Sequence, residues 1–289
     1  MSLEGTIVAA FGRHYEVAAA DGQRWQAMPK GKRCVYACGD RVQVEPAGDG
    51  QVRIADHLPR SSLLYRSDEW KQKVIAANAT QIVLVVATEP AFSDELLSRA
   101  LVAAEHEKLR VVIVLNKCDL ADRVAAARVQ LAPFATLGYA VLELSAKQSA
   151  EPLRAELSGQ VSVLVGQSGM GKSTLVNALV PGAGAATREI STALDSGKHT
   201  TTHARLYRLD ERSAIIDSPG LQEFGLAHLS FGEIEDGFTE FRQTLGRCRF
   251  HDCRHGAEPG CAVKALAETG QINRRRYEHF LAIAGRLAA

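Results

Sequence analysis

The sequence predicts an α/β fold, in which a doubly wound domain follows a small all-β domain and precedes a short helical module. Three observations support this order. From about residue 80, continuous aliphatic runs alternate with helical segments, as buried parallel strands and their covering helices do. Before about residue 60, short runs of β-forming residues are separated by glycine turns. After about residue 222 the pattern becomes helical and carries clustered cysteine and histidine.

The bulk composition is that of a soluble globular protein. The 289 residues have room for about two domains, or three if two are small, and 46% of the residues are hydrophobic. No apolar run approaches the roughly 20 residues of a membrane helix, and the N-terminus lacks the basic start and apolar core of a secretion signal. We therefore expect a cytoplasmic protein without a membrane partner, in which the six cysteines form no disulfide framework.

The first 60 residues are predicted to form a small barrel of about five strands, because an open sheet of this size would be marginally stable. The predicted strands include 5–10, 14–18 and 40–44, with hairpin turns at Asp21-Gly22 and Gly48-Asp49-Gly50. A basic stretch follows Trp25 and contains Lys30, Lys32 and Arg33. These side chains suit contacts to an RNA backbone, although an ordinary solvated turn has the same composition.

The aliphatic runs of the α/β domain mark its strands. A helix between the first two runs is predicted over 93–108, with Ser93 as N-cap and acidic residues in the first turn. Another helix is predicted over 272–287, at the end of the chain. The predicted strands are 81–87, 110–115, 139–144, 161–165 and 214–217.

A phosphate-binding loop is predicted between the strand at 161–165 and a helix at 174–179. Its Gly-x4-Gly-Lys-Ser pattern allows backbone N–H groups to turn inward around phosphates at a helix N-terminus. Lys172 can neutralise the β- and γ-phosphate oxygens, and the hydroxyl of Ser173 can bind Mg²⁺. The predicted nucleotide-binding residues here are Gly166, Gln167, Ser168, Gly169, Met170, Gly171, Lys172, Ser173 and Thr174.

Two further segments are predicted to select guanine. The carboxylate of Asp119 can accept hydrogen bonds from N1–H and the exocyclic amine of guanine, a donor pair that adenine lacks. Asn116 would reach N7 or tie the loops together, Lys117 would cover the base, and the N–H of Ala146 would meet O6. Cys118 fills a variable position. The predicted residues are Asn116, Lys117, Cys118 and Asp119, then Ser145, Ala146 and Lys147.

The remaining nucleotide motifs are predicted to surround Mg²⁺ and the γ-phosphate. Asp217 ends a strand and should hold Mg²⁺ through water, with the N–H of Gly220 toward the γ-phosphate. Leu221 follows, where many GTPases have a glutamine that orients water, so we expect slow intrinsic hydrolysis. In the segment 198–203, Thr201 should close over Mg²⁺. His199 either positions water or moves with the switch, unless it is an exposed loop imidazole.

The order of these motifs is unusual. The guanine-reading segments come before the phosphate loop, and the segment of Asp217 comes last. This order predicts a circularly permuted GTPase, in which the chain leaves Gly220 and runs directly toward the C-terminal module.

The C-terminal module has the spacing of a zinc site. Three cysteines and one histidine within fourteen residues fit a closed Cys₃His site that binds one structural Zn²⁺. Such a metal would contribute folding free energy on the order of 10 kcal/mol to a segment too small for its own core. His251 competes with His255 for ligation, and we favour His255. The predicted ligands are Cys248, Cys253, His255 and Cys261.

The net charge of +1 conceals an asymmetry, because the stretch from Arg242 onward has nine Lys and Arg against four acidic residues. A basic terminal module suggests a polyanionic partner, with nucleic acid as the first candidate, although charge runs are usually solvated faces.

Together these features resemble the ribosome small-subunit-dependent GTPase A family over essentially the whole chain. The most specific are the motif order, the Gly-Gln-Ser-Gly-x-Gly-Lys-Ser loop, the His-Thr-Thr-Thr segment and the Cys/His spacing. The resemblance implies an oligonucleotide-binding (OB) fold over 1–62, a permuted GTPase domain over 63–222 and a zinc module over 223–289. It also implies stimulation by the small ribosomal subunit and its rRNA, late in subunit maturation. A monomer is expected. The Pro-Lys-Gly-Lys-Arg-Cys loop at 29–34 departs from the family pattern.

Two other functions compete with this interpretation. The chain could be a GTP-dependent regulator of a protein, with the zinc module as the protein-binding surface and binding insensitive to salt. It could also be a nucleic-acid-binding protein with a vestigial nucleotide domain, which the complete set of Lys172, Ser173, Asp217 and the guanine motif disfavours.

Overall fold

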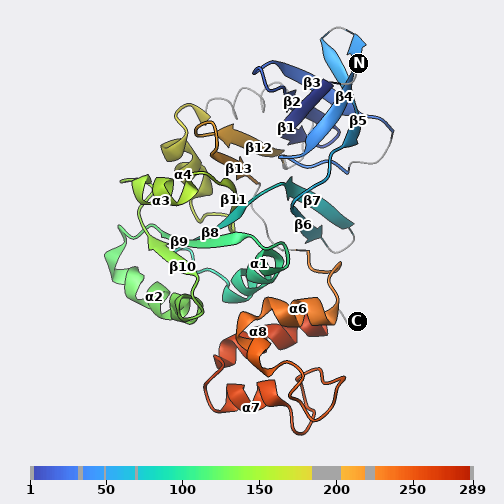
Figure 1. The fold of residues 1–289 in the computed structure, drawn as a ribbon. Coiled ribbons are helices and arrows are strands. Elements are labelled where there is room, and N and C mark those ends of the chain that lie inside the picture. The colour runs from blue at the N-terminus through green and yellow to red at the C-terminus, as the bar shows by residue number, and fades with distance from the viewer. Residues whose placement is uncertain are drawn as a thin grey trace.

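In the computed structural model, an eleven-stranded sheet runs from the N-terminal barrel into the α/β domain (Figure 1). The structure describes residues 3–31, 35–48, 50–68, 71–183, 203–218 and 225–286, with the backbone alone at 66–68, 71–72 and 203. Within the described residues no helix is long and apolar enough to cross a membrane.

The predicted barrel is confirmed. Its strands follow the order β1-β2-β3-β5-β4, and a further pairing of β1 with β4 closes the ring. The pairing of β3 with β5 is parallel, and the others are antiparallel. The barrel has its own core, which includes Ile7, Tyr15, Trp25 and Ile54. The strands are β1 (Leu3–Phe11), β2 (His14–Ala18), β3 (Arg24–Pro29), β4 (Arg41–Gly48) and β5 (Gln51–His57).

The α/β domain contributes the strand order β10-β9-β8-β11-β13-β12, parallel throughout except for the antiparallel strand β12. The five parallel strands coincide closely with the predicted aliphatic runs, and β8 is buried along its whole length. These strands are β8 (Gln81–Ala87), β9 (Arg110–Asn116), β10 (Ala140–Glu143), β11 (Val161–Val165), β12 (His203–Arg208) and β13 (Ala214–Asp217).

Four described helices belong to this domain. The hydroxyl of Ser93 accepts a hydrogen bond from the N–H of Leu96, so the predicted N-cap of the first helix is present. The helices are α1 (Asp94–His106), α2 (Ala121–Thr136), α3 (Glu151–Leu157) and α4 (Lys172–Leu179), and a separate hairpin joins β6 (Leu63–Asp68) to β7 (Lys71–Ala77).

The barrel and the α/β domain are joined through backbone pairing. Strand β1 pairs with β12, with Ala9 opposite Arg205 and Ala10 opposite Ala204. Gly39 makes a second junction, since a Cβ atom there would lie 2.2 Å from the carbonyl oxygen of Ala77. The side chain of Asn78 donates a 3.0 Å hydrogen bond to the carbonyl of Gly39.

The C-terminal module packs against the α/β domain through α1, which contacts both α6 and α8 (Figure 1). Phe238, Phe241 and Phe280 are fully buried and belong to the same core cluster as the α/β sheet. The module therefore shares a core with the α/β domain, whereas the barrel strands pack around a separate core. Its elements are α6 (Phe231–Gly237), a 3₁₀ helix η1 (Thr239–Thr244), α7 (Ala262–Glu268) and α8 (Arg274–Gly285).

Candidate nucleotide site and zinc centre

The predicted nucleotide segments meet at one edge of the parallel sheet. Neighbouring parallel strands β8, β9, β10, β11 and β13 end there, and their carboxyl-terminal loops are the usual place for ligands in such sheets. The loops carry Glu89, Asn116, Ser145, the phosphate loop and Asp217, respectively. The permuted motif order is thus compatible with one site, because sheet neighbours need not be sequence neighbours.

Asn116 ties three of these loops together. It is 2% exposed, and its Nδ2 donates a 2.9 Å hydrogen bond to the carbonyl of Met170 in the phosphate loop. Its Oδ1 accepts a 2.9 Å hydrogen bond from the N–H of Ala146. The sequence leaves two roles open for Asn116, contact with guanine N7 or a link between loops. In this geometry the side chain links the loops.

Two glycines of the phosphate loop are required by close packing. A Cβ atom at Gly166 would lie 2.2 Å from the carbonyl oxygen of Val85, and one at Gly171 would lie 2.3 Å from Nδ2 of Asn116. Gly171 also has a φ of 91°, which side chains rarely adopt. The tight turn therefore places the start of α4 directly behind the guanine-reading loop.

Lys172 and Asp217 form the charged floor of the site. Lys172 is 9% exposed, and its Nζ donates hydrogen bonds to the carbonyls of Gly166 and Gln167 at 2.5 and 3.0 Å. Burial lowers the pKa of Lys172, and burial raises the pKa of Asp217 to about 6 despite the opposing charge of the lysine. Both groups sit in a poorly solvated position where a charged ligand interacts strongly.

The guanine-reading loop presents an ionised carboxylate. Asp119 is exposed, and the nearby Ser145 hydroxyl is the main cause that lowers the pKa of its carboxyl. Lys117 has a φ of 62° and its Nζ donates a 2.7 Å hydrogen bond to the carbonyl of Glu89. Cys118 donates to the carbonyl of Leu115 at 3.3 Å, as expected of a packed residue in the variable position.

These groups border a cavity of about 830 Å³. Its volume is in the range of small-molecule sites. Glu89, Pro90, Leu120 and Ser218 also lie in this wall, and the sequence motifs assign them no role. The one feature of the sequence that marks these residues is their position, since each lies within three residues of a strand end or a motif. The cavity is lined by Glu89, Pro90, Lys117, Asp119, Leu120, Lys147, Ser168, Gly169, Gly171, Lys172, Ser173, Thr174, Asp217 and Ser218.

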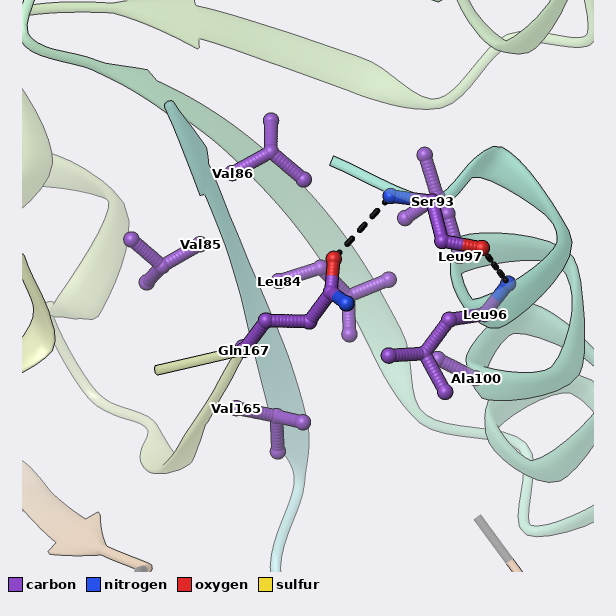
Figure 2. Close-up of a pocket in the computed structure, with 10 residues that line it drawn as sticks. Leu84, Val85, Val86, Ser93, Leu96, Leu97, Ala100, Val165 and Gln167 are labelled. Carbon is purple, nitrogen blue, oxygen red and sulfur yellow. Dashed lines mark hydrogen bonds between the residues drawn. The ribbon is translucent and has the colours of Figure 1, made fainter. Parts of the chain in front are cut away.

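The other residues predicted to bind nucleotide do not line this cavity. Asn116, Cys118, Ser145, Ala146, Gly166, Gln167 and Met170 lie in or next to the loops that form it. Figure 2 shows the side chain of Gln167 directed toward Ser93, and its Oε1 accepts a 3.0 Å hydrogen bond from the N–H of Ser93. A second, small cavity of about 30 Å³ lies beside it, with Leu84, Leu97 and Val165 among its walls. His199, Thr201, Gly220 and Leu221 lie outside the described residues.

The four predicted zinc ligands come together in the C-terminal module. The ligand atoms of Cys248, Cys253, His255 and Cys261 all lie within 4.8 Å of one another. The sulfurs of Cys248 and Cys261 are 3.9 Å apart. At a Zn–S distance of about 2.3 Å, tetrahedral geometry requires about 3.8 Å between sulfurs, so the donor set fits one Zn²⁺. His251 is exposed and outside this group.

The surroundings of the cluster orient its ligands. Nδ1 of His255 lies 3.2 Å from the sulfur of Cys261, while Nε2 hydrogen-bonds Glu235 on α6. Such a carboxylate–histidine pair fixes the ring so that the other nitrogen faces a metal. The N–H groups of Ala262 and Lys264 lie 3.3 Å from the sulfurs of Cys248 and Cys261, an arrangement that favours thiolates.

Comparison with known proteins agrees with this geometry. The family model for RsgA GTPase matches residues 57–227. A relative from Neisseria meningitidis serogroup C / serotype 2a, named small ribosomal subunit biogenesis GTPase RsgA, is 54% identical over 270 residues, covering 93% of this chain and 88% of the relative. The crystal structure of YjeQ from Thermotoga maritima has a TM-score of 0.75 and 30% sequence identity, covering 100% of this chain and 99% of that one. YloQ, described as a circularly permuted GTPase, has a TM-score of 0.70 at 24% identity, covering 100% and 96%.

The sheet order, the permuted motifs and the Cys/His cluster define a circularly permuted GTPase with a barrel before it and a zinc-compatible module after it. The predicted fold class is confirmed. The chain belongs to the RsgA GTPase family, as the sequence resemblance predicts, and it is a GTP hydrolase.

Proposed function

We propose that this GTPase binds the small ribosomal subunit and hydrolyses GTP to GDP and phosphate on it, late in the maturation of the subunit. The observation that carries the proposal is the 54% identity, over 93% of the chain, to a relative named for small-subunit biogenesis. The basic stretch from Arg242 onward supports an rRNA contact, because phosphates are bound mainly by cationic side chains.

The guanine base is proposed to lie between the two guanine-reading loops. Asp119 would accept from N1–H and the exocyclic amine, and the low pKa of its carboxyl supports this role. Lys117 would cover the base, Lys147 would flank it, and the N–H of Ala146 would donate to O6. The bridge of Asn116 supports the arrangement because it fixes the spacing between this pocket and the phosphate loop.

The phosphates are proposed to bind the phosphate loop and Lys172. The loop N–H groups and the first turn of α4 would donate to the β-phosphate, as at other helix N-termini. Ser173, Thr201 and Asp217 would hold Mg²⁺. Bound with GTP, Mg²⁺ would supply positive charge that neutralises the phosphate oxygens. Lys172 would stabilise the negative charge on the β- and γ-phosphates.

Turnover is proposed to depend on the subunit. Leu221 carries no group that can orient a water molecule, so the chain supplies fewer catalytic groups than GTPases with glutamine there. The N–H of Gly220 would meet the γ-phosphate, and His199 would position water or move with the switch. The subunit would order or complete this set and raise the rate.

The domain roles follow from the same proposal. Residues 1–62 would form an RNA-binding barrel, 63–222 the GTPase domain and 223–289 a module held by one structural Zn²⁺. Contacts at Gly220 would reposition this module against rRNA and so couple the nucleotide state to subunit affinity. A cytoplasmic monomer is the proposed working form.

The test is GTP turnover with and without purified small ribosomal subunits, at low and high salt. Strong stimulation that fades with salt would support an rRNA-activated GTPase, because phosphate contacts weaken as salt rises. Large ribosomal subunits serve as the matched control and should not stimulate. Tight GTP binding with no stimulation by small subunits would contradict the proposal and favour regulation of a protein partner through the zinc module.

A further inference from the structure

The zinc module exposes an aromatic ring although its other aromatic residues are packed together. Phe238, Phe241 and Phe280 are fully buried and pack against one another, and the rings of Phe241 and Phe280 also contact His255. Phe250 is 41% exposed and, among the large hydrophobic residues that are exposed in the described chain, it is the one aromatic. A single exposed apolar side chain is common, so the surroundings of Phe250 decide whether it has a role.

The loop that carries Phe250 is held at both ends. The predicted zinc ligands Cys248 and Cys253 flank it, and the N–H of Cys253 donates a 3.3 Å hydrogen bond to the carbonyl of Phe250. The N–H of Arg249 donates to the carbonyl of Gly260 at 3.0 Å. A ring held this way loses little conformational freedom when a ligand covers it.

Three arginines lie on this loop. Arg247, Arg249 and Arg254 are exposed, and their side chains form no ion pair with any residue that the structure describes. The guanidinium carbon of Arg249 lies 5.5 Å from the centroid of Phe250, and that of Arg254 lies 5.1 Å from the centroid of Phe231. Asp252, Glu235, Glu258 and the net charge of a zinc–thiolate cluster oppose them, so the arginines offer local contacts beside the ring and no net positive charge.

A hollow of about 560 Å³ runs along this loop. Its wall includes Phe250, His251 and the two arginines at 249 and 254, with Phe231 and Glu235 on the side of α6. The hollow thus combines exposed aromatic rings with cations and has room for a planar group.

We propose that the loop 247–254 binds an unpaired RNA nucleotide, with Phe250 as the surface on which the base stacks and the arginines as phosphate contacts. Aromatic rings with nearby cations are the usual platform for single-stranded nucleic acid, because every base has a π-face. A base within a duplex is already stacked and cannot reach the ring, so unpaired nucleotides are favoured. The inference rests on the proposed function for its biological partner, and its chemistry can be tested separately.

The test is the affinity of the full-length zinc-loaded protein for fluorescent single-stranded oligoadenylate, with an RNA duplex as the comparison probe. Phe250→Leu keeps an apolar side chain but removes the aromatic face, and should weaken oligoadenylate binding about tenfold, within the range for loss of one stacked base. Phe250→Trp should retain the affinity and show quenching of the new indole on binding. Val129→Ala, at another exposed apolar position, should change nothing.

Each outcome bears on the inference. Three results would overturn it. Wild type and Phe250→Leu could bind oligoadenylate equally with unchanged zinc content, or the leucine and tryptophan variants could lose affinity equally. The third is a preference of the protein for the RNA duplex. A second titration with small ribosomal subunits separates the two proposals. If subunits bind wild type and Phe250→Leu alike, the base contact is refuted and the proposed function stands. If subunits do not bind but oligoadenylate binding needs the aromatic ring, the proposed function fails and the base contact stands.

Discussion

Substitution of Asn116 by alanine should damage guanine-nucleotide binding through the loops rather than through a lost ligand contact. The side chain makes two 2.9 Å hydrogen bonds, to the carbonyl of Met170 and from the N–H of Ala146, and all three residues are buried. Losing both bonds and leaving their partners unsatisfied should cost roughly 2–4 kcal/mol of stability. If about 2 kcal/mol of this cost is lost from the free energy of GDP binding, GDP affinity falls about 30-fold.

The assay is a fluorescence titration with labelled GDP, paired with thermal unfolding. Asn78→Ala is the matched control. Asn78 also accepts one backbone hydrogen bond, from Ser61, and donates one, to Gly39, but it lies at the barrel junction. The control should lose stability and keep its GDP affinity. If Asn116→Ala binds GDP as wild type does, or if the two variants lose affinity equally, the bridging role of Asn116 is refuted.

Four other predictions concern the metal sites and the phosphate loop. Glu235→Gln should lower zinc affinity about 10- to 100-fold in chelator competition, whereas Asp236→Asn on the same helix should not. Because burial raises the pKa of Asp217 to about 6, the Mg²⁺ concentration needed for half-maximal GTP turnover should rise as the pH falls through 6, and a flat profile would count against this role. The same shift makes the nucleotide-free protein lose the stability contribution of this carboxyl as the pH rises through 6, which urea unfolding beside Asp217→Asn can measure. Gly171→Ala should abolish GDP binding in the titration with labelled GDP, because its Cβ would collide with Asn116, and retained binding would show that the loop can relax.

The strands of the GTPase sheet were predictable because parallel strands buried on both faces are continuous aliphatic runs. The runs at 81–87, 161–165 and 214–217 coincide with β8, β11 and β13. The pairing of β12 with β1 was not predicted, because backbone hydrogen bonds between domains leave no pattern in the side chains. Helix α2 was also missed, since its many alanines give a faint apolar stripe and Pro133 lies inside it.

The candidate site was predictable where chemistry fixes both residue type and spacing. The motifs around Lys172 and Asp119 are of this kind, and the structure brings their loops to one cavity. The part of the cavity wall formed by Glu89 and Leu120 was not predictable, because the conformations of their loops place these residues there. The direction of the Gln167 side chain, toward Ser93, likewise depends on where α1 begins. The ligand roles of all these residues stay predictions.

The affinity of the protein for small ribosomal subunits, compared between a non-hydrolysable GTP analogue and GDP, tests the central claim most directly. A ligand can shift an equilibrium only by its differential affinity for the two states, so a nucleotide-controlled subunit factor must distinguish them. Coupling predicts tighter binding with the GTP analogue, and a difference that persists when salt lowers both affinities. Equal affinity in the two nucleotide states would contradict the coupling of the GTPase site to the subunit.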